Sequence, residues 1–290
     1  MRSSADTTVW SVRALLVLGR VSNLPTIFSN CLAAWVLGGG GSVGHFLLLN
    51  LGAALLYTGG LYLNDAFDAD FDRQRRRERP IPSGQISLAL VWRLGWLWLG
   101  LGMAVFLWVG WGSFAVAVLL ALVTVLYNAI HKRTALAVVL MGLCRFLLYL
   151  LGAASATEIS GLAIWSGLAL GLYVGGLSYL ARKESILGPV QVWPILTLAA
   201  PVGLALLVNG PGYRERAFYL SLLLVIWILP SLRYVFRKEP RQIGFAVSNL
   251  LAGIVLVDLL ATAGEPWGVV PAFVLLFIAA VGLQRFVPAT

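Results

Sequence analysis

"VGHFLLLNLGAALLYTGGLYLNDAFDADFDRQRRRERPIPSG", residues 43–84, changes character halfway along its length. Residues 43–63 form an apolar run, and about 20 such residues are enough for a helix to cross a bilayer. Asn64 and four aspartates follow within nine residues, and a cluster of arginines comes directly after them. The stretch therefore predicts a membrane-spanning helix that ends in a strongly charged segment at the membrane surface.

The rest of the 290-residue chain repeats the apolar half of this stretch. Hydrophobic residues make up 60% of the chain, the mean hydropathy is +0.88, and only 11% of residues are charged, against about 25% in soluble domains. No run shows the alternation of a membrane β-barrel. We expect one all-α domain over residues 1–290, a polytopic bundle of nine or ten transmembrane helices around an intramembrane cavity. The expected spans are 23–40, 43–63, 88–109, 112–130, 135–155, 160–181, 190–208, 215–236, 243–262 and 267–286. A short run over 14–18 predicts an interfacial helix before the first span.

The distribution of basic residues predicts the orientation. Seventeen of the 21 Lys and Arg fall in one set of loops, and only Arg214 and Arg216 fall in the opposite set. The positive-inside rule therefore places the loops 64–87 and 182–189 in the cytoplasm, which suits a multi-pass protein of the cell inner membrane with its site facing inward. Because the basic residues are dispersed over membrane loops, the net charge of +9 indicates anionic lipid rather than nucleic acid as a partner.

The acidic segment has helical spacing. On a helix continuing residues 43–63, Asn64, Asp65, Asp68 and Asp72 share one face, whereas Asp70 points to the other side. Like charges on one face repel, and oxygen ligands without His or Cys suit Mg²⁺, which usually completes its shell with substrate phosphate. The segment therefore predicts a site for a Mg²⁺-bound diphosphate, with the following arginines neutralising phosphate oxygens. The competing interpretation is a solvated helix end with a polybasic lipid anchor.

Five segments of this sequence resemble the UbiA superfamily of intramembrane prenyltransferases. "NDAFDADFD" (64–72) is similar to the family's NDxxDxxxD motif, and "RPIPSGQI" (79–86) resembles its continuation. "RVSNLPT" (20–26), "YNAIHKRT" (127–134) and "SNLLAG" (248–253) resemble family segments of the first, fourth and ninth helices.

The resemblance implies a role for particular residues. Asn64, Asp65, Asp68 and Asp72 would hold Mg²⁺ on an isoprenyl diphosphate, while Arg20, Asn23, Arg79 and Lys132 would contact the substrate. Asp68, Asp72, Tyr127 and Lys132 would be the catalytic residues, with Tyr127 near the reacting allylic carbon. Tyr127 and Lys132 are also explained as an interfacial aromatic and a positive-inside anchor.

The sequence departs from the family where a second acidic motif is expected. "YVGGLSYLARKES" (173–185) contains no Asp, and its one carboxylate, Glu184, follows Arg182 and Lys183. We expect Arg182 or Lys183 to contact the diphosphate in place of a second metal, with Tyr179 and Glu184 in the same substrate site. The alternative is a positive-inside anchor. The "ARKE" segment and the "HK" after "YNAI" resemble the EboC-like branch of the superfamily.

Arg145 lies about ten residues, or roughly 15 Å, inside the fifth span. An ionisable residue at this depth indicates a functional site, and we assign Arg145 to substrate binding. The competing interpretation is a structural pair with Asp258 or with a helix-end carbonyl.

These features predict a Mg²⁺-dependent enzyme that transfers an isoprenyl group from an isoprenyl diphosphate to a small or lipid-soluble acceptor, hydrophobic or aromatic. An apolar bundle excludes water from the allylic carbocation, and metal and cations stabilise the departing diphosphate. The alternative is a non-catalytic binder or transporter of a prenylated metabolite on the same fold. A lipid-phosphate phosphotransferase is disfavoured because no nucleotide-binding motif is present.

Overall fold

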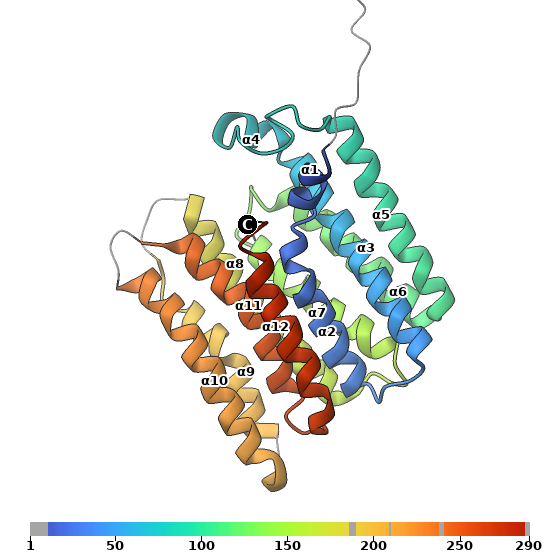
Figure 1. Ribbon diagram of the computed structural model, residues 1–290, viewed down its shortest axis with the longest axis vertical. Helices are drawn as coiled ribbons and strands as arrows, with labels where there is room; N and C mark the ends of the chain where they lie inside the picture. Colours follow the sequence, from blue (N-terminus) through green and yellow to red (C-terminus); the bar gives the residue numbers. More distant parts are fainter. Residues whose placement is uncertain (1–10, 186–189, 209, 238–240, 288–290) are drawn as a thin grey trace, which may run out of the picture.

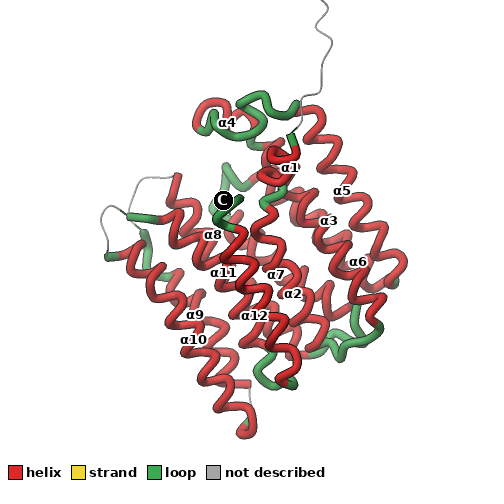
Figure 2. The backbone as a smooth tube through the Cα atoms, viewed as in Figure 1, coloured by secondary structure: helices red, strands yellow, loops and turns green. Residues whose placement is uncertain are grey.

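The computed structural model describes residues 11–185, 190–208, 210–237 and 241–287. These residues form helices joined by loops and turns, and the described part of the chain contains no strand (Figure 2). Seven helices in it are long and apolar enough to cross a membrane, and three shorter apolar helices accompany them. The all-helical class is therefore confirmed, while the total of nine or ten spans stays a prediction.

Each predicted span corresponds to one helix. The short helices at the N-terminal end and after the second span are α1 (Val12–Leu18), η1 (Val21–Asn23) and α4 (Ala69–Arg75). The seven long helices are α3 (Val43–Phe67), α5 (Leu88–Val109), α6 (Trp111–Ile130), α7 (Ala137–Ala154), α8 (Gly161–Ser185), α10 (Pro211–Phe236) and α11 (Ile243–Ala261). The shorter apolar helices are α2 (Leu24–Leu37), α9 (Pro194–Val208) and α12 (Val270–Leu283), with η2 (Trp267–Val269) leading into the last.

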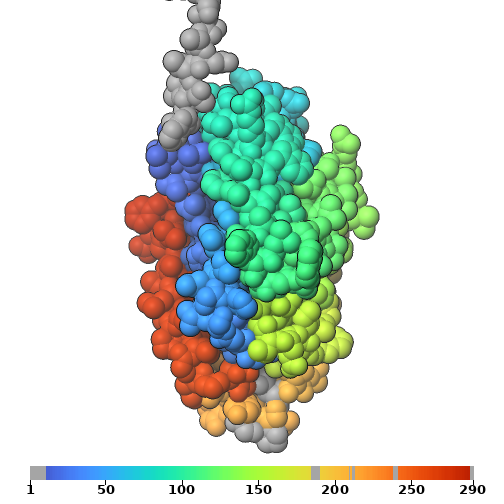
Figure 3. All heavy atoms as spheres, turned by 90° about the vertical axis from the view of Figure 1, so that its right-hand side faces the viewer, coloured from blue at the N-terminus to red at the C-terminus, as the bar shows by residue number. Residues whose placement is uncertain are grey.

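The helices form one bundle with α2 and α7 near its middle (Figure 1). On one side α3 packs against α5 and α6, and on the other side α8 and α11 pack against α9 and α10. Helix α12 returns to α2 and η1, so the last span of the chain lies beside the first. In the view turned by 90°, α5 covers the upper part of the visible face (Figure 3). Large apolar side chains such as Leu122 and Leu207 are exposed on outer faces, as expected of a surface in contact with lipid.

Glycines allow the closest helix contacts. A Cβ on Gly142 of α7 would lie 2.5 Å from the carbonyl oxygen of Gly171 in α8, and a Cβ on Gly59 of α3 would lie 2.9 Å from that of Gly95 in α5. Association of helices in lipid depends on such close packing rather than on a hydrophobic driving force. These contacts hold together the walls around the cavity described below.

Candidate functional site

The helix that carries the acidic residues is interrupted at Asp68. Helix α3 ends at Phe67 and α4 begins at Ala69, with Asp68 as the cap residue between them. The single continuous helix expected over 64–72 is therefore wrong in this detail. The backbone N–H groups of Asp68 and Asp72 nevertheless donate to the carbonyl oxygens four residues earlier, at 3.0 and 2.9 Å, so the helical spacing is preserved.

The predicted face of the acidic segment is buried. Asn64, Asp65, Asp68 and Asp72 are 8, 6, 5 and 2% exposed. The side chain of Asp70, by contrast, is 89% exposed and pairs with the neighbouring Arg73 at 2.5 Å. The sequence argument for which aspartate points away from the site is thus confirmed by the geometry.

Two of the carboxylates share one arginine. Nη1 of Arg79 donates to Asp65 Oδ1 and to Asp72 Oδ2, both at 3.1 Å. Nη2 of Arg20 donates to the same Asp65 oxygen and to Asn64 Oδ1, both at 3.4 Å. Arg20 has φ +39°, in the left-handed region that is sparsely populated by residues other than glycine. The packing at the start of α2 therefore holds this arginine in a strained backbone conformation toward the acidic face.

Asp68 contacts two side chains that follow α6. Nε2 of His131 lies 3.3 Å from Asp68 Oδ1, and Nζ of Lys132 lies 3.1 Å from Asp68 Oδ2. Burial raises the pKa of Asp68, but the hydrogen bonds and charges of His131 and Lys132 outweigh burial and hold that pKa below its ordinary value. Asp68 is therefore ionised at neutral pH.

Asp72 lies in a less favourable environment for a charge. Burial raises its pKa, Arg79 opposes this rise, and the nearby charges of Asp68 and Asp65 add to it, so the pKa stays above its ordinary value. Its Oδ1 atom is buried and has no hydrogen-bond partner in the described part of the chain. A buried oxygen of this kind is an available ligand for a cation.

Asn128 belongs to the same site, although the sequence argument missed it. Its Oδ1 accepts from Asn64 Nδ2 at 3.1 Å, and its Nδ2 donates to the carbonyl oxygen of Gly60 at 2.8 Å. The predicted Tyr127 precedes it and stacks on His131, with 5.0 Å between ring centroids. His131 was also not assigned to the site, and the signal that pointed to both residues was their place in the "YNAIHK" segment.

A cavity of about 630 Å³ opens from these groups into the bundle, within the usual size range of small-molecule sites. Its polar end, here called the mouth, is lined by Arg20, Asn23, Asn64, Asp68, Arg79, Tyr127, Asn128, His131, Lys132 and Arg182 among others. Its apolar lining includes Ile27, Ala53, Leu56, Leu99, Leu120, Ala121 and Leu148. Asp65 and Asp72 are not lining residues and reach the mouth through Arg79.

Segment 173–185, which stands where a second acidic motif is expected, has side chains both inside and outside the cavity. Arg182 lines the mouth, and its Nη1 donates to the carbonyl oxygen of Thr134 at 2.6 Å. Tyr179 instead accepts a hydrogen bond from the backbone N–H of Gln191, and Lys183 lies over the Tyr179 ring at 5.7 Å. Neither Tyr179 nor Lys183 lines the cavity. Their substrate roles stay predictions that position does not support, and the side chain of Glu184 lies outside the described residues.

Arg145 lines the cavity further inside and is 8% exposed. It does not pair directly with Asp258 in the described structure. Instead Asn30 of α2 lies between them: its Oδ1 accepts from Arg145 Nη1 at 2.7 Å, and its Nδ2 donates to Asp258 Oδ2 at 2.6 Å. The competing interpretation of a structural Arg145–Asp258 pair is therefore replaced by an indirect link.

The donors at the mouth fit Mg²⁺ in kind. Carboxylate and amide oxygens are its preferred protein ligands; Asn64 and Asp68 line the mouth, and the unpartnered Asp72 Oδ1 lies behind it. No group of three or more His, Cys, Asp or Glu among the described residues is gathered around a single metal position. Side-chain cations neutralise the carboxylates instead.

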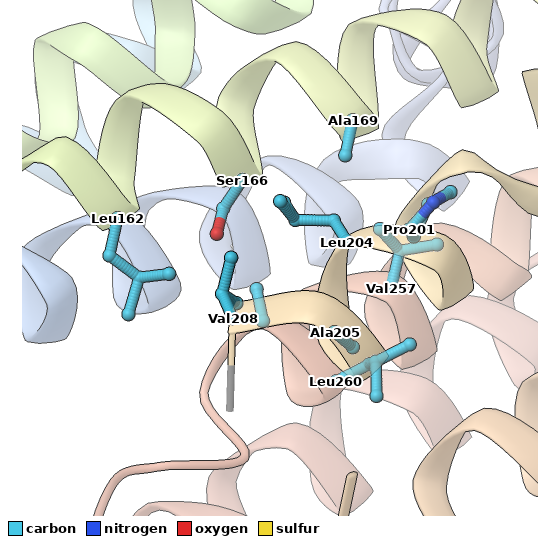
Figure 4. Close-up of a pocket in the computed structure, with 10 residues that line it drawn as sticks. Leu162, Ser166, Ala169, Pro201, Leu204, Ala205, Val208, Val257 and Leu260 are labelled. Carbon is cyan, nitrogen blue, oxygen red and sulfur yellow. The ribbon is translucent and has the colours of Figure 1, made fainter. Parts of the chain in front are cut away.

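A second, much smaller hollow lies between α8, α9 and α11 (Figure 4). Its volume of about 20 Å³ is enough for roughly one water. Ser166 is its one polar side chain among apolar neighbours such as Leu162 and Leu204. It is too small for a substrate, so the larger cavity is the candidate site.

Comparison with known proteins agrees with this geometry. The model of the UbiA prenyltransferase family matches residues 22–288. A digeranylgeranylglyceryl phosphate synthase of Metallosphaera sedula is 30% identical over 135 residues, which span 47% of this chain and 40% of that relative. The matched segment thus spans less than half the length of this curated relative.

Solved structures share the fold. A UbiA homologue from Aeropyrum pernix K1 is 18% identical with a TM-score of 0.67, over 86% of this chain and 99% of that one. A UbiA homologue from Archaeoglobus fulgidus bound to GPP and Mg²⁺ is 16% identical with a TM-score of 0.52, over 94% of this chain and 99% of that one. The resemblance to the EboC-like branch is not tested by these relatives and stays a prediction.

Proposed function

Because the chain belongs to the UbiA prenyltransferase family, we propose that it transfers an isoprenyl group from an isoprenyl diphosphate to a small or lipid-soluble acceptor. The observation that carries this proposal is one cavity with two chemically different regions. Its mouth combines oxygen ligands with side-chain cations, and its interior is largely apolar. A diphosphate with an isoprenoid tail has the same division between charge and hydrocarbon.

We assign the diphosphate to the mouth together with Mg²⁺. Asn64, Asp65, Asp68 and Asp72 would hold the metal, which supplies positive charge to the departing diphosphate. The Archaeoglobus fulgidus homologue of the same fold was solved with GPP and Mg²⁺, which supports this assignment. Arg20 and Lys132 line the mouth and are placed to neutralise phosphate oxygens that the metal leaves free.

Arg79 has a double role in this proposal. Without metal it neutralises Asp65 and Asp72, because buried carboxylates are costly unless paired. With Mg²⁺ and diphosphate bound, these carboxylates would hold the metal, and Arg79 would be free to neutralise phosphate oxygens. Asp72 Oδ1 lacks a hydrogen-bond partner in the described structure and would be available as a ligand.

Arg182 takes the place of the carboxylates expected in a second acidic motif. It is a cavity-lining cation held by the Thr134 carbonyl. A fixed guanidinium supplies one charge where a second Mg²⁺ would supply two. We therefore propose a site with a single metal, in which Arg182 completes the neutralisation of the diphosphate.

The allylic carbon lies just inside the mouth in this arrangement. Tyr127 lines the cavity there, and its ring can stabilise a developing carbocation through its electron-rich face. The apolar walls exclude water, which would otherwise quench the cation. Leu56, Leu99 and Leu120 provide the surface for the isoprenyl tail. We place the mouth on the cytoplasmic side of the inner membrane, from the asymmetry of Lys and Arg in the loops.

A non-catalytic binder or transporter is the second candidate. It is favoured by two observations: the carboxylates are already paired with cations, and no Asp is present in 173–185. Such a protein would bind a prenylated metabolite but leave the diphosphate bond intact.

The experiment that separates these candidates measures binding and turnover independently. Purified protein is incubated with a labelled isoprenyl diphosphate, Mg²⁺ and a membrane extract, and both bound label and prenylated product are quantified by mass spectrometry. An enzyme forms product, loses it in Asp68→Asn, and keeps it in the exposed control Asp70→Asn. Tight binding of the label without product in the wild type would instead identify the protein as a non-catalytic binder.

A further inference from the structure

Arg145 carries a charge deep in the bundle without a direct counter-ion among the described residues. It is buried, lies on α7 about 12 Å along the helix axis from its first residue, Ala137, and lines the cavity. A charge at membrane depth is costly and is retained where it serves a substrate or an ion. The diphosphate site at the mouth does not explain it, because the mouth has its own cations.

The hydrogen bonds of Arg145 leave one edge of its guanidinium open. Nη1 donates to Asn30 Oδ1 at 2.7 Å and to the Thr26 carbonyl oxygen at 3.4 Å, and Nη2 donates to Thr26 Oγ1 at 3.2 Å. Five N–H groups are available on a guanidinium. The Nε–H and the second N–H of Nη2 therefore have no partner among the described residues. These two donors lie on the same edge, in the fork geometry that receives both oxygens of a carboxylate or phosphate.

A group that binds the open edge of Arg145 would come from the cavity. Thr26 and Asn30, which bind the other N–H groups, do not line the cavity, whereas Arg145 does. Both partners belong to α2, so their bonds fix the guanidinium against this helix.

Asp258 stabilises this arrangement without occupying it. It is fully buried, and its Oδ2 accepts from Ser29 Oγ at 2.5 Å and from Asn30 Nδ2 at 2.6 Å. The bond from Asn30 Nδ2 orients the amide so that Asn30 Oδ1 faces Arg145. If charge neutralisation were the only purpose, a direct bond between Arg145 and Asp258 would achieve it. The intervening amide instead keeps the fork of Arg145 available.

From this geometry we infer that Arg145 is the docking point for an oxyanion of the acceptor, a carboxylate or a phosphate. The inference rests on the proposed prenyl transfer, because it assigns the acceptor to the same cavity. The acceptor then has an acidic group that reaches Arg145, and a nucleophilic atom that faces the allylic carbon near Tyr127. Thr26 and Asn30 are positioning residues that hold the guanidinium, and Asp258 acts through Asn30.

The test uses matched ligands that differ in charge. With the mouth filled by Mg²⁺ and inorganic pyrophosphate, titration calorimetry on the purified full-length chain compares 4-hexylbenzoate, its neutral amide, and 4-hexylphenyl phosphate. We expect an oxyanion to bind at least about tenfold more tightly than the amide. Arg145→Gln should remove this preference, and Arg145→Lys should retain part of it, because an ammonium keeps the charge but not the fork. The oxyanion that binds more tightly, carboxylate or phosphate, identifies the acidic group of the acceptor.

Arg93→Gln is the matched control, because Arg93 also lies within a span but is exposed on α5 outside the cavity. It should behave as wild type. Pyrophosphate affinity is measured first in the wild type and in every variant. Absence of pyrophosphate binding to the wild type counts against the proposed function, whereas the ligand comparison still tests Arg145. The inference is overturned if the wild type binds neither oxyanion better than the amide, or if Arg145→Gln keeps the preference.

Discussion

Replacing Arg79 by Gln should destabilise the metal-free protein and make its stability depend on Mg²⁺. The guanidinium is 16% exposed and pairs with two carboxylates, Asp65 and Asp72, that are 8 and 2% exposed in their side chains. Removing one partner of a buried ion pair costs about 3–5 kcal/mol, because the remaining charge has no compensation. Asp72 is left without its cation, while Asp65 keeps Arg20, so we expect a cost within that range.

The assay is thermal unfolding in detergent, with and without Mg²⁺. A loss of this size lowers the melting temperature by roughly 10 °C in a chain of this length. Mg²⁺ should recover most of the loss, since it occupies the carboxylates that Arg79 has vacated, and it should stabilise the variant more than the wild type. The control is Arg77→Gln, an exposed arginine of the same loop, which should change stability by about 0.5 kcal/mol or less.

Two results would refute this reasoning. Equal stability of the Arg79 and Arg77 variants would show that the bridging arginine does not neutralise the acidic face. Equal stabilisation of wild type and Arg79→Gln by Mg²⁺ would show that the metal does not replace the arginine at these carboxylates.

Three further predictions concern the mouth, the helix packing and the orientation. Arg182→Ala should lower turnover by about 10²-fold or more, because it removes a group that stabilises transition-state charge. Lys183 lies outside the cavity, so Lys183→Ala should keep wild-type steady-state kinetics. Equal effects of the two substitutions would exclude Arg182 from the site. Gly142→Ala should lower the melting temperature, because its Cβ would lie 2.5 Å from the backbone of the neighbouring helix. Gly175→Ala should not, because the atom nearest to its Cβ would be 3.8 Å away. Similar melting temperatures of the two variants would contradict the packing. A single cysteine at Arg133, in a chain without native cysteines, should resist a membrane-impermeant thiol reagent in intact cells, and labelling from outside would reverse the predicted topology.

Local periodicity explains what could be predicted from the sequence. Apolar runs located the seven long helices and the three shorter apolar helices of the described residues, because a helix in lipid must satisfy its own backbone. The spacing of Asn64, Asp65, Asp68 and Asp72 located a buried face, and it placed Asp70 outside it. Hydrogen bonds four residues apart continue through the break at Asp68, which is why an argument from an unbroken helix gave the correct face.

Contacts between distant helices could not be predicted in the same way. Asn128 joins Asn64 across 64 positions, and Asn30 joins Asp258 across 228. The position of Arg145 deep in a span marked it as unusual. No local sequence pattern, however, shows that the amide of Asn30 lies between Arg145 and Asp258. Likewise the charge cluster at 182–184 did not reveal that Arg182 faces the cavity while Lys183 lies over Tyr179, since that depends on how α8 is rotated in the bundle.

The central claim is tested most directly by the fate of C1-labelled isoprenyl diphosphate in a single turnover on the purified protein with its extracted acceptor pool. The proposed function predicts that label enters an extractable lipid-soluble product, that one diphosphate is released for each product formed, and that both stop when EDTA removes Mg²⁺. Label that stays bound as intact diphosphate in the presence of Mg²⁺, with no product and no release, would contradict prenyl transfer.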